Sequence, residues 1–448
     1  MHIEGRRADA RLRKFVAVSP AVPPVLGLLA AHALGSAIRG IEEGRGLGAW
    51  HHAFRDALMS PSSSLVALAV AYGFSLGLGG IGIAACLGAA ICIAPAAPPL
   101  WHFSKQYPHL RLSTIGAFAV LCAGVLARPM TPTGWDEFVW LGKARLESVG
   151  FGTGATSALN AHAHLMPPGY PTLWPASVGW LSIGADDLTA LTVSATFLLL
   201  VCCGTFIERL ARDGVSPGWA SAPIPVIFLL FVGCLGAPLV LVHLRSTYVD
   251  LPMGLLGAAL FLELRSPAPS PLVAASLAVV LVGFKDEGLA HLLSACAGAA
   301  YCRGSFRGVN RATYVALTAG LVGFASWQLA LSSHGIGRDH GSFSPSISWF
   351  PSLLRLAFSH ATELVSWGLF WPITLAALLH ARLHRPTAGA ALALVLNLGF
   401  VCAMLLLGPP RVRAFAENGT LVNRILVQMW PLALLILKGP WQMRSDTK

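Results

Sequence analysis

The residues best suited to chemistry are an acidic pair, Asp136 and Glu137, in a tryptophan-rich polar stretch between two apolar runs. A carboxylate can take a proton from a reacting hydroxyl group. His162 and His164 follow, and then a Pro-Pro-Gly-Tyr-Pro turn at 167–171. Such a stretch at a membrane surface faces the headgroup zone, where a lipid-borne substrate presents its polar end. We therefore interpret it as a candidate active site. The alternative is an interfacial amphipathic helix with a solvated salt bridge.

Three further polar clusters stand at the ends of apolar runs. Asp250 begins one run and could be only a helix cap favoured by the helix dipole. Lys285, Asp286 and Glu287 are consecutive ionisable residues between two apolar runs, where charge is costly and points to function; the alternative is a charged external turn. Arg424 opens the last run, with Gln428 four residues later on the same helix face. Arginine suits a phosphate because its donors are paired, although it could also be an interfacial residue reaching toward water.

Metal and nucleotide sites have weaker support in the sequence. His162, His164 and His291 could bind a metal, but a His-x-His pair without a third spaced ligand favours substrate contact or hydration. The chain has no phosphate-binding Walker A motif and no Gly-x-Gly-x-x-Gly after a strand. A divalent cation stays open as a cofactor, with no residue assigned to it.

The composition is that of a membrane protein. Charged residues make up 11% of the chain, against about 25% in soluble domains, and the mean hydropathy is +0.66. The net charge of +11 is dispersed among short loops, which argues against a nucleic-acid partner. The nine cysteines include no Cys-x-x-Cys pair, which excludes the usual disulfide and zinc patterns.

Apolar runs predict an all-α polytopic fold with about 12–13 transmembrane helices. The segment 168–184 is interrupted by prolines, and we expect it to lie along the membrane interface with Trp174 and Trp180 as anchors. The predicted runs are 15–38, 64–80, 82–98, 112–128, 187–208, 222–242, 250–264, 270–284, 287–302, 312–332, 360–380, 387–408 and 422–438. The predicted domains are an N-terminal transmembrane block (1–128), an outer catalytic loop with interfacial helices (129–186), a C-terminal bundle (187–438) and a cytoplasmic tail (439–448).

The distribution of basic residues predicts the orientation. From residue 208 onward, alternate loops are richer in arginine and lysine, which assigns them to the cytoplasm. The loops with Asp136, Asp250 and Lys285 then lie outside. The four runs before residue 129 do not fit this scheme if the basic N-terminus is cytoplasmic. Either that terminus lies outside or one early run does not cross.

The clusters, in this order, resemble the GT-C superfamily of integral-membrane glycosyltransferases, particularly the glycosyltransferase-39-like group. The similar motifs are Gly-Trp-Asp136-Glu137, Gly-Tyr170-Pro, Tyr-Val-Asp250-Leu-Pro, Lys285-Asp-Glu287-Gly and Arg424 with Gln428, over roughly 130–435. The resemblance implies a sugar transfer from a polyprenyl-phosphate carrier. The sugar would be a hexose or a pentose, and the acceptor a lipid-linked or cell-envelope glycan. The expected place is the periplasmic or extracellular face of a bacterial inner membrane.

The resemblance also implies roles for particular residues. Asp136 would be the base, with Glu137 as the alternative, and Asp250 a second acid of the same site. The expected substrate-binding residues are Lys143, His162, His164, Tyr170, Lys285, Glu287 and Arg424. Two other functions stay open: a secondary transporter, in which intramembrane charges also occur, and an O-antigen-type polymerase or ligase. Convergence of Asp136, Asp250 and Arg424 would favour the transferase.

Overall fold

The computed structural model describes residues 62–66, 68–69, 132, 135–149, 170–182, 188–213, 237–244, 246–304, 310–333, 335–336, 344–380 and 385–442. Within these ranges the chain forms helices and connecting turns, with no strand. The fold is therefore all-helical where it is described, as the apolar runs predict. The predicted runs at 15–38, 82–98 and 112–128 lie outside the described residues.

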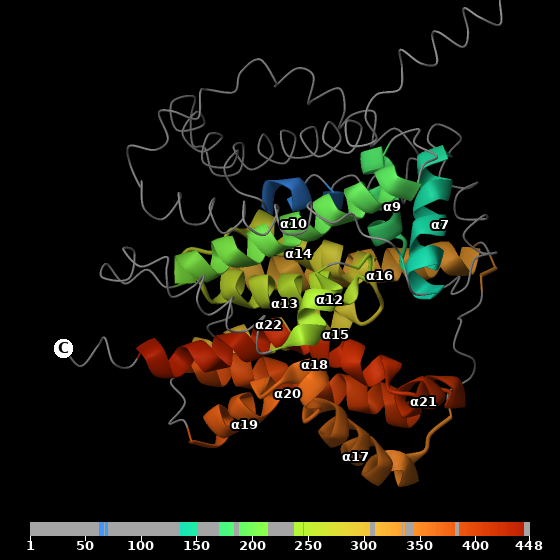
Figure 1. The fold of residues 1–448 in the computed structure, drawn as a ribbon. Helices are drawn as coiled ribbons and strands as arrows, with labels where there is room; N and C mark the ends of the chain where they lie inside the picture. Colours follow the sequence, from blue (N-terminus) through green and yellow to red (C-terminus); the bar gives the residue numbers. More distant parts are fainter. Residues whose placement is uncertain are drawn as a thin grey trace, which may run out of the picture.

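The helices follow one another from α7 near the acidic pair to α22 at the end of the described chain (Figure 1). Their bounds are α7 Trp135–Val149, α9 Leu173–Ser182, α10 Leu188–Asp213, α12 Pro238–His243, α13 Asp250–Arg265, α14 Pro271–Phe284, α15 Gly288–Cys302, α16 Arg311–Ser333, α17 Phe350–Ala361, α18 Leu364–Trp367, α19 Phe370–His380, α20 Arg385–Leu407, α21 Pro410–Glu417 and α22 Thr420–Gln442, with a 3-10 turn η4 at Ile347–Trp349.

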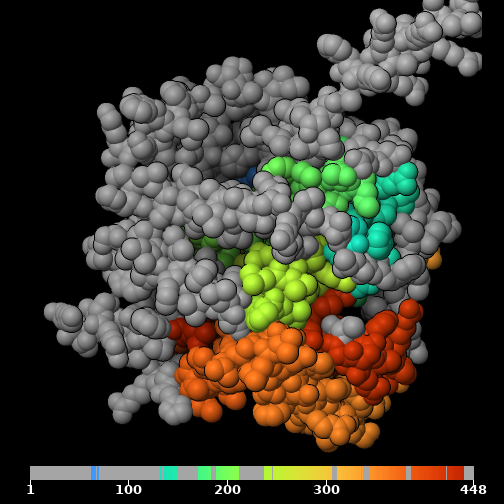
Figure 2. Space-filling model, viewed as in Figure 1, coloured from blue at the N-terminus to red at the C-terminus, as the bar shows by residue number. Residues whose placement is uncertain are grey.

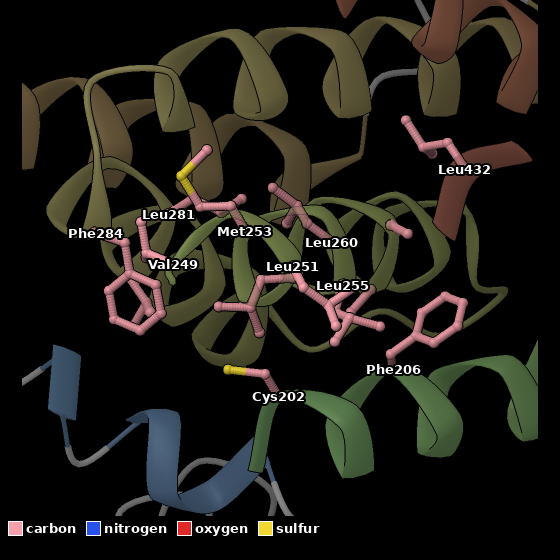
Figure 3. Packing of buried hydrophobic residues seen from close by; sticks show 14 of the residues in the cluster. Cys202, Phe206, Val249, Leu251, Met253, Leu255, Leu260, Leu281, Phe284 and Leu432 are labelled. Atoms are coloured by element: carbon pink, nitrogen blue, oxygen red, sulfur yellow. The ribbon is translucent and has the colours of Figure 1, made fainter. Parts of the chain in front are cut away.

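Helix α13 is the centre of the packing. It contacts α10, α14, α15 and α22, and Figure 1 shows these helices side by side, with α7 and α9 gathered near one end. In Figure 3, Cys202 and Phe206 of α10 point toward Leu251 and Leu255 of α13. These four side chains are at least 95% buried. Because lipid tails are as apolar as these side chains, close van der Waals packing is what holds such helices together within a membrane.

One glycine sets the distance between α13 and α22. A Cβ atom at Gly254 would lie 2.3 Å from the carbonyl oxygen of Gln428. The two backbones therefore touch at this level, one turn into α13. This contact brings the polar residues of α22 to the start of α13, where Asp250 stands.

Three described helices are long and apolar enough to cross a membrane: Leu188–Leu210, Arg311–Ser333 and Arg385–Leu407. The pair α21 and α22, bent by 81° at its break, would make a fourth. In the second and third spans most residues are not buried within the protein. The C-terminal helices, orange and red in Figure 2, also present apolar side chains such as Phe358 and Leu379 on the surface. These faces suit contact with lipid.

The structure differs from the sequence prediction in one segment. The predicted run 360–380 is divided into the end of α17, α18 and α19, and Gly368, with φ +51°, ends α18. In the segment 168–184, expected to lie along the interface, the ten residues of α9 are all buried against the protein. Trp174 donates its indole N–H to the carbonyl oxygen of Thr247 at 3.2 Å, so it anchors α9 within the protein.

Candidate active site

Four separate segments bring charged residues to one place. Asp136 lies in the first turn of α7, and Asp250 is the first residue of α13. Lys285 follows the last residue of α14. Arg424 projects from the first turns of α22. The residues are as much as 288 positions apart in sequence, and helix packing around α13 assembles them.

Asp250 is the centre of this cluster. Its side chain is fully buried, and three donors satisfy its two oxygens. Oδ2 accepts a hydrogen bond from Arg424 Nε at 2.7 Å, while Oδ1 accepts from Gln428 Nε2 at 2.7 Å and from Lys285 Nζ at 3.2 Å. Two cations and an amide favour the charged form of a carboxylate. The alternative reading of Asp250 as a simple helix cap does not account for these contacts across helices.

Arg424 joins the two aspartates. Its Nε donates to Asp250, and its Nη1 donates to Asp136 Oδ2. The guanidinium also lies over the ring of Tyr248, with its carbon 5.0 Å from the ring centre. The side chain of Asp136 is 44% exposed, whereas that of Asp250 is 0% exposed. The acid at α7 can therefore meet a reactant, and the acid at α13 can only hold the cations in place.

Lys285 is the second cation of the cluster. Its Nζ lies 2.8 Å from Glu287 Oε1 as well as 3.2 Å from Asp250, and 5.7 Å from the centre of the Tyr170 ring. Burial alone would lower the pKa of Lys285, but Asp250 and Glu287 outweigh it and raise that pKa above its usual value. Lys285 is thus a stable positive charge. Burial, followed by the charge of Glu287, raises the pKa of Tyr170, so this phenol stays neutral.

Glu137 points away from the cluster, toward the segment before α13. Its Oε1 accepts from Thr247 N at 2.9 Å and from Thr247 Oγ1 at 3.3 Å. Glu137 is buried, so its contacts fit a residue that fixes the chain next to Asp250. Lys143 is buried too, with Nζ 5.6 Å from the centre of the Trp140 ring. Lys143 lies on α7, about two turns after Asp136.

A series of buried, hydrogen-bonded side chains extends from Asp250 through Gln428 and His291 to Asn397. Gln428 donates to Asp250, so its Oε1 is left to accept from His291 Nε2 at 3.3 Å. His291 Nδ1 then accepts from Asn397 Nδ2 at 2.8 Å. Every donor in this series meets an acceptor if His291 is neutral with its proton on Nε2. His291 is therefore a positioning residue, and this arrangement leaves no place for it as a metal ligand.

His243 was not singled out by sequence reasoning, yet it lies beside the cluster. Its ring centre is 5.4 Å from that of Tyr248, and its Nδ1 is buried without a hydrogen-bond partner in the described part of the chain. Burial lowers the pKa of His243 to about 4, so it is neutral at pH 7. The sequence signal for His243 was its place in the short polar segment between two apolar runs, just before Asp250.

His162 and His164 lie outside the described residues. Among the residues that are described, no group of three or more His, Cys, Asp or Glu side chains is arranged to hold a metal ion. In the described part of the chain, the guanidinium group of Arg424 bridges Asp136 and Asp250.

In comparisons with known proteins, no protein-family model matches the chain, and neither a curated protein nor a solved structure matches it significantly.

Proposed function

We propose that this chain is a membrane glycosyltransferase that moves a sugar from a polyprenyl-phosphate carrier to a lipid-linked or cell-envelope glycan. The observation that carries the proposal is the double contact of Arg424 with Asp136 and Asp250. It joins a solvent-accessible carboxylate, a fixed carboxylate and a cation from three motifs that resemble those of GT-C enzymes.

Asp136 is the candidate base. Its Oδ2 faces Arg424, and its side chain is partly exposed, so an acceptor hydroxyl can reach it. A base must lie within hydrogen-bond reach of the proton that it removes. In the proposed step the acceptor oxygen attacks the anomeric carbon, the bond from that carbon to the phosphate oxygen breaks, and the hydroxyl proton passes to Asp136. The phosphate leaves on its lipid with the bonding electrons, and direct displacement inverts the anomeric centre.

Arg424 and Lys285 are the candidate groups for the leaving phosphate. Negative charge grows on that group as the bond breaks, and fixed cations lower the energy of such a state. Both cations are held in place before a ligand arrives, Arg424 by Asp250 and Tyr248, Lys285 by Asp250 and Glu287. This arrangement requires little reorganisation during the reaction.

The surrounding helices suit a substrate with a lipid tail. The cluster lies at the start of the apolar helix α22, and the described spans α16 and α20 have apolar faces that are not covered by protein. A polyprenyl chain can stay in the bilayer while its phosphate reaches the cations. We place the reaction on the non-cytoplasmic face, from the distribution of basic loops, and in a bacterial inner membrane, as the resemblance to GT-C enzymes implies.

The proposal is tested by mass spectrometry of lipid-linked glycans and envelope polysaccharides in cells that lack this chain. We expect one glycan to lose a sugar, and restoration by the wild-type gene but not by Asp136→Asn. A matched control is Glu417→Gln on exposed α21, whose Oε1 accepts from Trp349 Nε1 at 3.1 Å; the amide keeps this bond, so the control should restore the glycan. An unchanged glycan profile together with altered solute uptake would contradict the proposal and favour a transporter.

A further inference from the structure

The charges of the site are already compensated before any ligand binds. Arg424 and Lys285 contact three carboxylates, those of Asp136, Asp250 and Glu287. Among the described residues in contact here, three carboxylates therefore face two cations. A phosphate that simply joined this cluster would meet net repulsion, since like charges at such short range cost energy in a partly buried site. An anion can bind only if one carboxylate leaves the cations or if another cation enters.

The three carboxylates differ in their freedom to leave. Asp250 has no exposed surface and three donors. The side chain of Glu287 is 11% exposed and lies against Lys285. Asp136 is 44% exposed, and its contact with Arg424 is its one hydrogen bond within the described residues. Removing a partly exposed carboxylate to water costs little compared with a buried one. Asp136 is therefore the carboxylate that an incoming anion can replace.

We infer that the phosphate of a lipid-linked donor binds by displacing Asp136 from Nη1 of Arg424. Asp250 and the ring of Tyr248 hold the guanidinium while this partner is exchanged. A phosphodiester carries one negative charge, like the carboxylate that it replaces, so the charge around Arg424 is unchanged. The identity of the anion as a donor phosphate rests on the proposed function, whereas the competition between an anion and Asp136 for Arg424 does not.

The exchange has a functional consequence. While Asp136 is bound to Arg424, its Oδ2 is occupied by the Nη1 donor. When the phosphate takes that place, the carboxylate is released beside the bound sugar donor, where it can take the proton of an acceptor hydroxyl. The base is then available when a donor is bound and held back when none is present.

The test is the binding of a short prenyl methyl phosphate, a phosphodiester with one negative charge, to the full-length protein in detergent, at fixed ionic strength and with a chelator present. We expect Asp136→Asn and Asp136→Ala each to bind the prenyl methyl phosphate about ten-fold more tightly than wild type, because the competing charge is gone. Glu417→Gln should bind like wild type. In an Arg424→Gln background the gain from Asp136→Asn should disappear, which assigns the competition to this pair.

Each outcome bears on the inference. Unchanged or weaker binding in both Asp136 variants overturns it, as does a gain that requires a divalent cation. Inorganic phosphate serves as the second probe: a gain confined to the prenyl methyl phosphate supports the lipid source, and an equal gain for both probes overturns that source. If the gain is found but wild type transfers no sugar, the exchange stands and the proposed function fails.

Discussion

Replacing Asp250 by asparagine separates the electrostatic role of this residue from its shape. The amide occupies the same space, but one of its two groups becomes a donor facing Arg424, Gln428 or Lys285. Removing one partner of a buried ion pair typically costs about 3–5 kcal/mol. Here Arg424 keeps Asp136, and Lys285 keeps Glu287. We therefore expect the free energy of unfolding to fall by about 3 kcal/mol, at the lower end of that range.

The assay is a denaturant titration in mild detergent that compares Asp250→Asn with Asp136→Asn and Glu417→Gln. The partly exposed pair of Asp136 should contribute no more than about 1 kcal/mol. If Asp250→Asn is no less stable than the Glu417→Gln control, Asp250 is not the charge that holds the cations.

The remaining predictions concern turnover, binding and pH. Asp136→Asn should lower kcat by about 10²–10⁴-fold. Glu137→Gln should lower kcat less, because Glu137 contacts Thr247. A larger loss of kcat for Glu137→Gln than for Asp136→Asn would identify Glu137 as the base. Arg424→Lys should weaken prenyl methyl phosphate binding because the planar paired donors are lost, and affinity equal to wild type would reduce Arg424 to an interfacial residue. The folded-state pKa of His243, about 4, lies below the usual value of 6.5. Its neutral form is therefore favoured on folding, and the stability that depends on it is present above pH 6.5 and lost as pH falls toward 4. His243→Gln should flatten this part of the stability profile, and an unaltered profile would contradict the assignment.

The sequence singled out the four charged residues that the structure brings together, but it left their convergence as an open test and did not predict the details of their contacts. Asp136, Asp250, Lys285 and Arg424 each stand at an end of an apolar segment, where an isolated charge is costly and a partner of opposite sign stabilises it. This reasoning anticipates a cluster. It cannot choose between Asp136 and Glu137, because consecutive residues on a helix point about 100° apart, and only the position of α7 relative to α13 decides which one faces Arg424.

Burial by neighbouring helices was also invisible in the sequence. The composition of α9, with two tryptophans and a proline, suits the membrane interface as well as the protein interior. The burial of α9 follows from its contacts with α7, α10 and α14. The supporting residue Asn397 has no motif around it, and its role follows from the packing of α20 against α15 and α22.

Helix α13 carries a second buried ion pair, and the contrast between its two ends supports the placement of the site. Arg209 contacts Glu263 near the C-terminal end of α13, about 20 Å along the helix from Asp250. Both members are almost completely buried, at 4% and 2% exposure. Arg209 Nη2 donates to Ser62 Oγ, while Glu263 Oε1 accepts from Ser270 N. No reactant can reach such a pair without unfolding its surroundings, so it fits a structural tie between α10 and α13. At the other end, the same kind of buried carboxylate is linked through Arg424 to an acid that water can reach. Chemistry needs this access as well as charge, and the Asp250 end of the described α13 combines them, because Arg424 links the buried Asp250 to the exposed Asp136.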